Sequence, residues 1–157
     1  MSVRGPQSGA KEIRGDPQER IELVIANRLE ELARVSESVD RLVARHRLPE
    51  DAGADLNIAL DEVLANLLQH AYDDAEVHEI RIALSAYPRA VVVEVEDDGR
   101  PFDPLVVPPP DRAALSTGSR IGGRGILFVR SLMSEVRYQR ADGKNRLTLT
   151  RIFEASN

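Results

Sequence analysis

Residues 61–72, DEVLANLLQHAY, hold the most informative pattern in the chain. They form the second half of a run from about Asp51 to Tyr72 in which apolar residues recur every three or four positions. This spacing predicts a helix that buries one face. Glu62 and Asn66 are four residues apart and therefore share a face of that helix, at the edge of the apolar stripe.

The pair of Glu62 and Asn66 suits two chemical tasks. A carboxylate in a polar-walled pocket can act as a general base. An amide oxygen one helical turn further along is a hard ligand of the kind that magnesium prefers. The same two residues would also fit an ordinary solvated helix face, so the pair alone does not decide between a site and a surface.

Periodicity outward from this helix predicts the remaining elements. In order, we expect a strand, a helix, the helix already described, two strands, a long loop, a short helix and two final strands. They span residues 20–25, 29–46, 51–72, 77–87, 90–96, 97–121, 125–133, 135–140 and 146–153. Paired strands with helices between them indicate an α/β two-layer sandwich, with a mostly antiparallel sheet and helices on one face.

Length and composition predict a single soluble domain. The chain has 157 residues, which we divide into a disordered tail at 1–18 and one domain at 19–157. Because cysteine is absent, disulfides and thiolate metal sites are excluded, and a reducing cytoplasm fits. No apolar run approaches the ~20 residues of a membrane helix. We therefore expect a cytoplasmic protein with no membrane segment.

Charge is unevenly distributed along the chain. The net charge of −5 argues against direct nucleic-acid binding. Residues 51–111 hold fourteen acids and three bases, a net of −11, whereas residues 112–157 hold three acids and nine bases, a net of +6. The acidic middle could hold a cation and the basic end could face an anion, although a mixed solvated surface would show the same counts.

Two further motifs suggest ligand contacts. Asp97-Asp98-Gly99 ends a predicted strand, where a carboxylate could accept a hydrogen bond from a ligand amine and a glycine would allow close approach, although Asp and Gly also simply favour turns. The run 122–125, GGRG, leads into a predicted helix and could either cradle phosphate or act as a flexible hinge. It is neither a Walker loop nor a dinucleotide fingerprint.

Taken together, these motifs resemble a known set. Residues 61–72, with the form E-x-x-x-N-x-x-x-H-A-Y, resemble the N box of GHKL ATPases. Residues 97–103 resemble their G1 box and residues 122–126 their G2 box. The resemblance covers about residues 18–153 and implies the Bergerat ATP-binding fold. Within that superfamily, the short length and the H-A-Y ending are most similar to the anti-sigma-factor serine/threonine kinases of bacterial partner-switching systems.

The resemblance implies a role for each matched residue. Glu62 would be the catalytic base toward a serine hydroxyl, and Asn66 would bind the magnesium that bridges the phosphates of ATP. Asp97 would accept the adenine amine, and Gly99 would let the base pack closely. Thr148, in the last strand, matches a threonine near the adenine.

The glycine-rich run implies the phosphate site. Gly122, Gly123 and Gly125 would cradle the phosphates. Arg124 stands where this branch usually has an apolar residue, and it could contact phosphate, contact a partner or face solvent. Pro101 replaces the second G1 glycine of many members.

The function implied is an ATP-dependent protein serine kinase that sequesters a sigma factor, as a homodimer, and phosphorylates a STAS-domain anti-anti-sigma antagonist. An alternative is an anti-sigma module that holds ATP without turnover; the intact Glu62 counts against it. A histidine-kinase catalytic domain separated from its parent is a third reading, disfavoured by the H-A-Y form. The first strand, at 21–25, could offer a sheet edge to a second copy.

Overall fold

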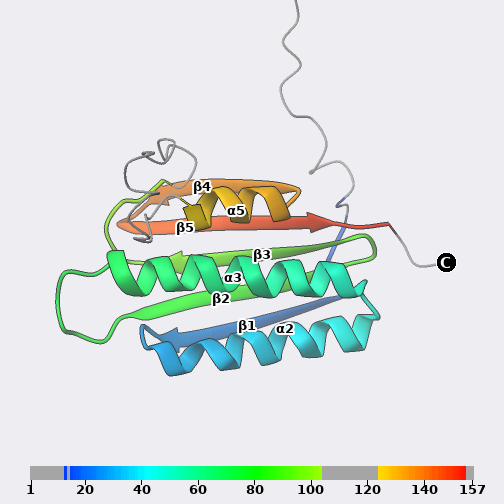
Figure 1. The fold of residues 1–157 in the computed structure, drawn as a ribbon, viewed down its shortest axis with the longest axis horizontal. Coiled ribbons are helices and arrows are strands. Elements are labelled where there is room, and N and C mark those ends of the chain that lie inside the picture. Colours follow the sequence, from blue (N-terminus) through cyan, green and yellow to red (C-terminus); the bar gives the residue numbers. More distant parts are fainter. Residues whose placement is uncertain (1–12, 14, 104–123, 155–157) are drawn as a thin grey trace, which may run out of the picture.

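The structure is a computed structural model that describes residues 13, 15–103 and 124–154. Its elements form two layers, a sheet and a row of helices (Figure 1). In chain order they are β1 (Glu19–Ala26), a 3-10 turn (Leu29–Glu31), α2 (Leu32–His46), α3 (Glu50–His70), β2 (Glu79–Tyr87), β3 (Ala90–Asp97), α5 (Arg124–Leu132), β4 (Glu135–Ala141) and β5 (Lys144–Ile152). The predicted α/β sandwich is confirmed.

The five strands make one antiparallel sheet in the order β1-β2-β3-β5-β4. The central strand is β3, which lies beside β5, with Asp97 directly opposite Asn145 at one end of the pair. Because successive side chains of a strand point to opposite faces, Val91, Val93 and Val95 lie on one face and are all buried.

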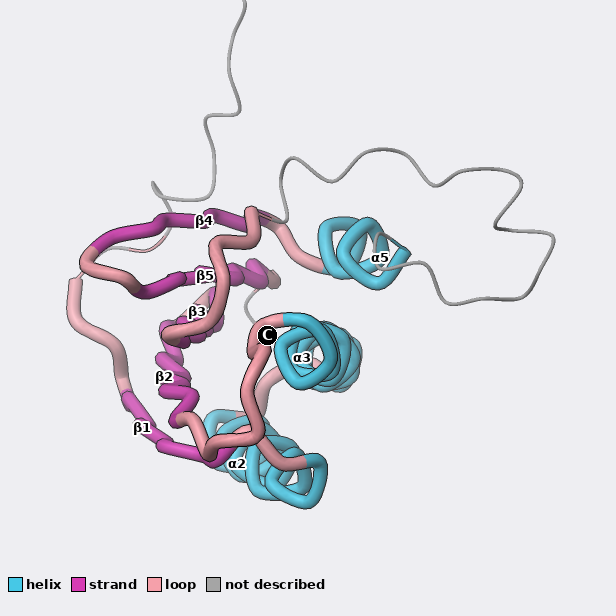
Figure 2. Tube along the Cα trace, turned by 90° about the vertical axis from the view of Figure 1, so that its left-hand side faces the viewer, coloured by secondary structure: helices cyan, strands magenta, loops and turns pink. Residues whose placement is uncertain are grey.

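The helices cover that buried face. Figure 2 shows α2, α3 and α5 on the same side of the curved sheet, and in Figure 1 α3 lies over β2 and β3. Leu56, Leu60 and Leu64 recur along α3 and are fully buried, as its period predicts. Each such side chain contributes about 1.5–3 kcal/mol by leaving water. This packing fixes α3 against the sheet and so fixes where its polar face lies.

The ends of the helices follow local chemistry. Arg47 ends α2 in the left-handed conformation, with a φ of 50°, and Pro49 then precedes the first turn of α3. The structure ends α3 at His70, two residues before the predicted end, and begins the first helical segment with a 3-10 turn. These differences move no side chain that the site uses.

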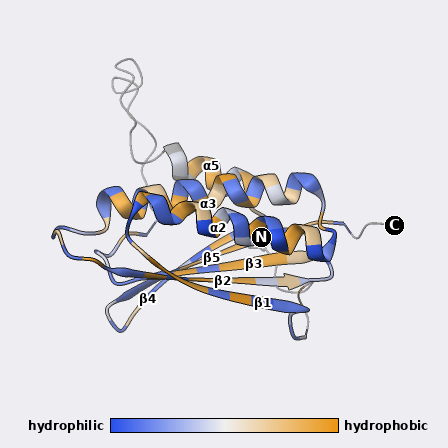
Figure 3. Ribbon diagram, turned by 90° about the horizontal axis from the view of Figure 1, so that it is seen from below, coloured by the Kyte–Doolittle hydropathy of each residue, from blue (hydrophilic) through white to orange (hydrophobic). Residues whose placement is uncertain are grey.

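Hydrophobic residues gather between the two layers, on the inward faces of α3 and the central strands (Figure 3). None of the described helices combines the length and apolarity required to cross a membrane. Most of the predicted tail and most of the predicted long loop, together with Gly122 and Gly123, lie outside the described residues.

Candidate functional site

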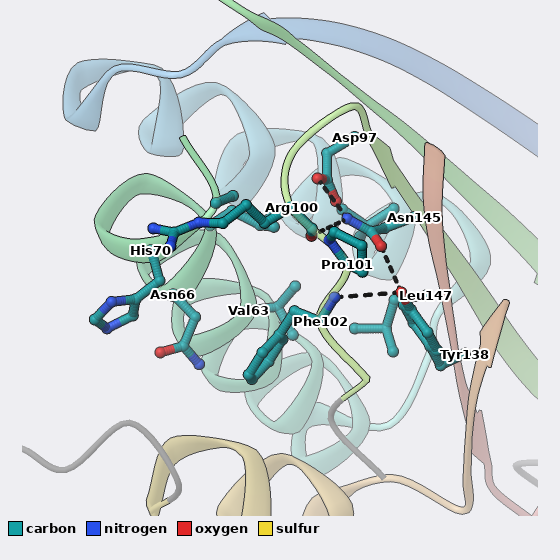
Figure 4. Close-up of a pocket in the computed structure, with 13 residues that line it drawn as sticks. Val63, Asn66, His70, Asp97, Arg100, Pro101, Phe102, Tyr138, Asn145 and Leu147 are labelled. Atoms are coloured by element: carbon teal, nitrogen blue, oxygen red, sulfur yellow. Dashed lines mark hydrogen bonds between the residues drawn. The ribbon is translucent and has the colours of Figure 1, made fainter. Parts of the chain in front are cut away.

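A cavity of about 290 Å³ opens between the last two turns of α3, the end of β3 and the strands β4 and β5 (Figure 4). Apolar side chains form much of its wall, among them Val63, Val95 and Leu147. Polar side chains also line it, among them Asn66 from α3 and Asp97 from β3 on opposite sides. An apolar cavity with a few fixed polar groups is the usual form of a small-ligand site.

Asp97 is the last residue of β3 and is only 3% exposed. The Gly99 N–H donates a 2.8 Å hydrogen bond to its Oδ1, which closes the turn after the strand. Burial is the main effect on this carboxyl and raises the pKa of Asp97 above its ordinary value, while hydrogen bonds from Asn145 and Gly99 lower it in part. A buried carboxylate that accepts hydrogen bonds is suited to recognise a ligand donor.

Gly99 brings this turn against the end of α3. A Cβ at residue 99 would lie 2.7 Å from both the Cβ and the carbonyl oxygen of Ala71. The next N–H, of Arg100, donates a 2.9 Å hydrogen bond to that same carbonyl. Glycine is therefore required here by its close approach to Ala71, whereas the expected close approach of a ligand to Gly99 stays a prediction.

Glu62 and Asn66 meet the first turn of α5. A Cβ at Gly125 would overlap Glu62 Oε2 and would lie 3.7 Å from Asn66 Nδ2. Asn66 Nδ2 is buried and has no hydrogen-bond partner among the described residues. An N-terminal helix turn attracts anions, and an unpaired amide beside it is an unfilled ligand contact. The unpaired Nδ2 is a donor, so this end of the site fits a phosphate group, and the Oδ1 of the same amide is the atom that a cation would need.

Among the residues described, no cluster of three or more His, Cys, Asp or Glu side chains could hold a metal ion. A cation here would depend on Asn66 and on oxygens of a ligand, which is the way magnesium commonly binds with nucleotide phosphates. The donor set fits magnesium as a nucleotide-bound ion.

The structure brings five of the predicted site residues to one region: Glu62, Asn66, Asp97, Gly99 and Gly125. Gly122 and Gly123 fall outside the described residues, as does the side chain of Arg124.

The assignment of Thr148 is corrected by the structure. Leu147 and Leu149 on either side of it are buried in the core, so Thr148 points to the opposite face of the sheet. Its strand neighbours there are Glu94 and Arg137. Thr148 therefore does not line the cavity.

Sequence reasoning missed Asn145, which lies directly opposite Asp97 and is 5% exposed. Asn145 Nδ2 donates a 3.1 Å hydrogen bond to Asp97 Oδ1. The predicted last strand began one residue later, at Arg146. The signal was the alternation itself, because residue 145 continues the inward series of Leu147 and Leu149.

His78 contacts the turn after β3 from outside the cavity. The His78 ring stacks on Tyr72, with centroids 4.3 Å apart, and its two nitrogens contact Asp74 Oδ1 at 2.7 Å and Asp98 Oδ1 at 3.2 Å. The hydrogen bond to Asp74 is the main reason that the pKa of His78 is raised. His78 thus links the loop after α3 to the residue next to Asp97.

Comparisons with known proteins agree with this geometry. A family model described as the histidine kinase-like ATPase domain matches residues 25–151. The serine/threonine-protein kinase BtrW of Bordetella bronchiseptica is 30% identical over 112 residues, which cover 71% of this chain and 79% of that protein. The serine-protein kinase RsbW of Listeria monocytogenes is 29% identical over 110 residues, which cover 68% of this chain and 70% of that protein.

A solved structure shows the same fold. The structure of the RsbU and RsbW domains of Rv1364c from Mycobacterium tuberculosis matches with a TM-score of 0.60 and 18% identity. The match covers 90% of this chain but 35% of that one, so this chain corresponds to about a third of it. With a family model over most of the chain and a relative at 30% identity, the protein belongs to the histidine kinase-like ATPase domain family.

Proposed function

We propose that the protein is an ATP-dependent protein serine kinase that also acts as an anti-sigma factor. The observation that carries the proposal is the meeting of Glu62 and Asn66 with the first turn of α5, beside a cavity whose far side holds the buried carboxylate of Asp97. That arrangement offers a base, an amide ligand and a helix N-terminus at one end and a hydrogen-bond acceptor at the other. The relatives named as serine kinases support the same reading.

The Asp97 end would bind the adenine. The carboxylate of Asp97 accepts a hydrogen bond from the exocyclic amine, and the ring packs between Val63 and Leu147. Gly99 keeps the turn close to α3, so that the base enters a narrow, largely apolar space. A hydrogen bond to a charged partner contributes about 1.5–3 kcal/mol, which would fix the base in one orientation.

The α5 end would carry out the transfer. Glu62 accepts the proton of the substrate serine while the serine oxygen bonds to the terminal phosphorus, and the bond from that phosphorus to the bridging oxygen of ADP breaks. Asn66 would hold magnesium, which when bound neutralises phosphate charge. The N–H groups that begin α5, with Gly122, Gly123 and Arg124, would face the phosphates.

The partners proposed are a sigma factor, which the protein sequesters, and a STAS-domain antagonist that carries the acceptor serine, all in the cytoplasm. A homodimer is part of this proposal. Support for it comes from β1, which pairs only with β2 among the described strands and so leaves its outer edge available. An unpaired strand edge is a ready site for pairing with another chain.

The test is transfer of labelled γ-phosphate to a purified STAS-domain protein. We expect Glu62→Gln to lower the rate by about 10²–10⁴-fold, the usual contribution of a positioned base. The matched control is Asp61→Asn, which alters the neighbouring, exposed acid and leaves the rate near wild type. Equal rates for the wild type and Glu62→Gln would show that Glu62 is not the catalytic base.

A second measurement separates kinase from binding module. ATP with magnesium should raise the melting temperature of the wild type, because a ligand that binds the native state stabilises it. A thermal shift without transfer to any STAS-domain protein would favour the module that holds ATP without turnover. No shift with ATP would contradict both readings.

A further inference from the structure

Asn145 is the centre of a buried hydrogen-bond network at the Asp97 end of the cavity (Figure 4). Its Nδ2 donates to the Arg100 carbonyl oxygen at 2.8 Å and to Asp97 Oδ1 at 3.1 Å. Its Oδ1 accepts hydrogen bonds from the Tyr138 hydroxyl and from Arg140 Nη1, the latter at 3.1 Å. One side chain thus connects β3, β4, β5 and the turn after β3.

The orientation of the Asn145 amide is fixed by these partners. Both groups on its Oδ1 side can donate, and all three groups on its Nδ2 side are acceptors, the Gly99 carbonyl oxygen at 3.4 Å being the third. A reversed amide would place its NH₂ against the guanidinium of Arg140, which has only donors, and its oxygen against Asp97. Asn145 therefore presents its NH₂ to Asp97 in every orientation that gives the amide suitable hydrogen-bond partners.

This donor decides which oxygen of Asp97 remains for a ligand. The hydrogen bonds that Asp97 receives from Gly99 N–H and from Asn145 Nδ2 both end on Oδ1. Within the described part of the chain, Oδ2 is thus the carboxylate oxygen left to accept from a molecule in the cavity. An ionised carboxylate only accepts, so the ligand must bring a donor to that point.

We infer that Asn145 is the positioning residue that makes this site select a purine with an amino group at its 6-position. By holding Oδ1, it directs Oδ2 at the ligand amine and prevents the carboxylate from turning to another partner. The inference rests on the proposed function, because it concerns the base of the same nucleotide. Asn145 acts through Asp97 and does not itself take part in phosphoryl transfer.

The experiment compares affinities for ATP and for purine riboside triphosphate, which differs from ATP only in lacking the 6-amino group. We expect the wild type to prefer ATP by about 10- to 150-fold, the value of one hydrogen bond to a charged group. In Asn145→Ala that preference should fall to less than about one-third of its wild-type value, while the ratio of ADP to ATP affinity stays the same. Gln139→Ala, on β4 between Tyr138 and Arg140 but on the opposite face, is the matched control and keeps the preference.

The two possible failures look different. If Asn145→Ala weakens both nucleotides by the same factor and leaves the preference intact, Asn145 has only a structural role and the inference is overturned. If the wild type binds neither nucleotide, the proposed function itself fails and the inference falls with it.

Two additional variants keep the test decisive. In an Asp97→Ala background, Asn145→Ala should change the preference no further, and a further loss would contradict action through Asp97. If Asn145→Ala does not fold, Tyr138→Phe removes one of the two donors on Asn145 Oδ1 and should lower the preference by about 2- to 12-fold, the range for a neutral hydrogen bond. An unchanged preference in folded Tyr138→Phe would then count against the inference.

Discussion

Gly125 and Glu62 are packed so closely that residue 125 has no space for a side chain, since a Cβ there would overlap Glu62 Oε2. The atom in the way is the end of a flexible side chain, not backbone. The fold could accept a larger residue by displacing the carboxylate. Gly125 therefore preserves the position of Glu62 more than it preserves stability.

Gly125→Ala tests this relationship. We expect phosphoryl transfer to fall by about 10²-fold, because a shift of about 1 Å in a reacting group has that effect. The free energy of unfolding should be unchanged or higher by up to about 1 kcal/mol, since alanine favours helix over glycine. Initial-rate measurements and urea unfolding check the two parts. Arg130→Lys, at an exposed position of the same helix, keeps the charge and should alter neither quantity, and full activity in Gly125→Ala would contradict the close contact.

Asp97→Asn should separate stability from binding. Because burial raises the folded-state pKa of Asp97, its contribution to stability is full below about pH 3.8 and is lost as pH rises through the folded pKa. The ionised form therefore destabilises the ligand-free protein at pH 7, and replacing it with asparagine should raise the free energy of unfolding there. The gain should shrink as pH falls toward 4.

The same variant should bind ATP about 10- to 150-fold more weakly, since an acceptor-only carboxylate is lost. Calorimetry with ATP and urea unfolding at several pH values measure both effects. Wild-type affinity for ATP in Asp97→Asn would show that Asp97 does not bind the adenine. A lower free energy of unfolding at pH 7 would contradict burial as the main effect on the Asp97 carboxyl.

His78 should make the stability of the protein depend on pH. Its folded pKa is raised, chiefly by Asp74, so the stabilisation is full below the unfolded value of about 6.5 and is lost as pH rises through the folded value. His78→Phe keeps a ring to stack on Tyr72 but removes both carboxylate contacts. Melting temperatures of the two proteins should differ most at pH 6 and converge at alkaline pH. If the melting temperatures of the two proteins differ by the same amount at every pH from 6 upward, the contacts of His78 with Asp74 and Asp98 contribute nothing to stability.

Thr148→Val should leave ATP affinity within about twofold of wild type, because the side chain lies on the sheet face away from the cavity. Valine has the same shape and suits a strand, so the fold should tolerate it. Calorimetry decides: a tenfold loss of affinity would restore the sequence-based assignment of Thr148.

Local periodicity was enough to predict the elements and the two-layer arrangement. The stripe of Leu56, Leu60 and Leu64 identified α3 and the face it buries, and the alternation of Val91, Val93 and Val95 identified β3. Both are repeating signals within one segment, which is why they survive without any knowledge of the tertiary structure.

The site was predictable only in part, because pairing between distant segments is not a local signal. Asp97 and Asn145 are direct partners although 48 residues separate them, and the register of β3 with β5 brings them together. Starting the last strand at Arg146 excluded Asn145. Counting the alternation from the buried Leu147 would have excluded Thr148 and included Asn145.

The packing of α5 on α3 affects how readily α5 unfolds locally. A nucleotide bridging Asp97 and the first turn of α5 would tie that short helix to the centre of the sheet, whereas without it α5 is held mainly by its neighbour α3. Amide hydrogen exchange along α5 should therefore slow when the site is filled, and the backbone of this one helix would report occupancy.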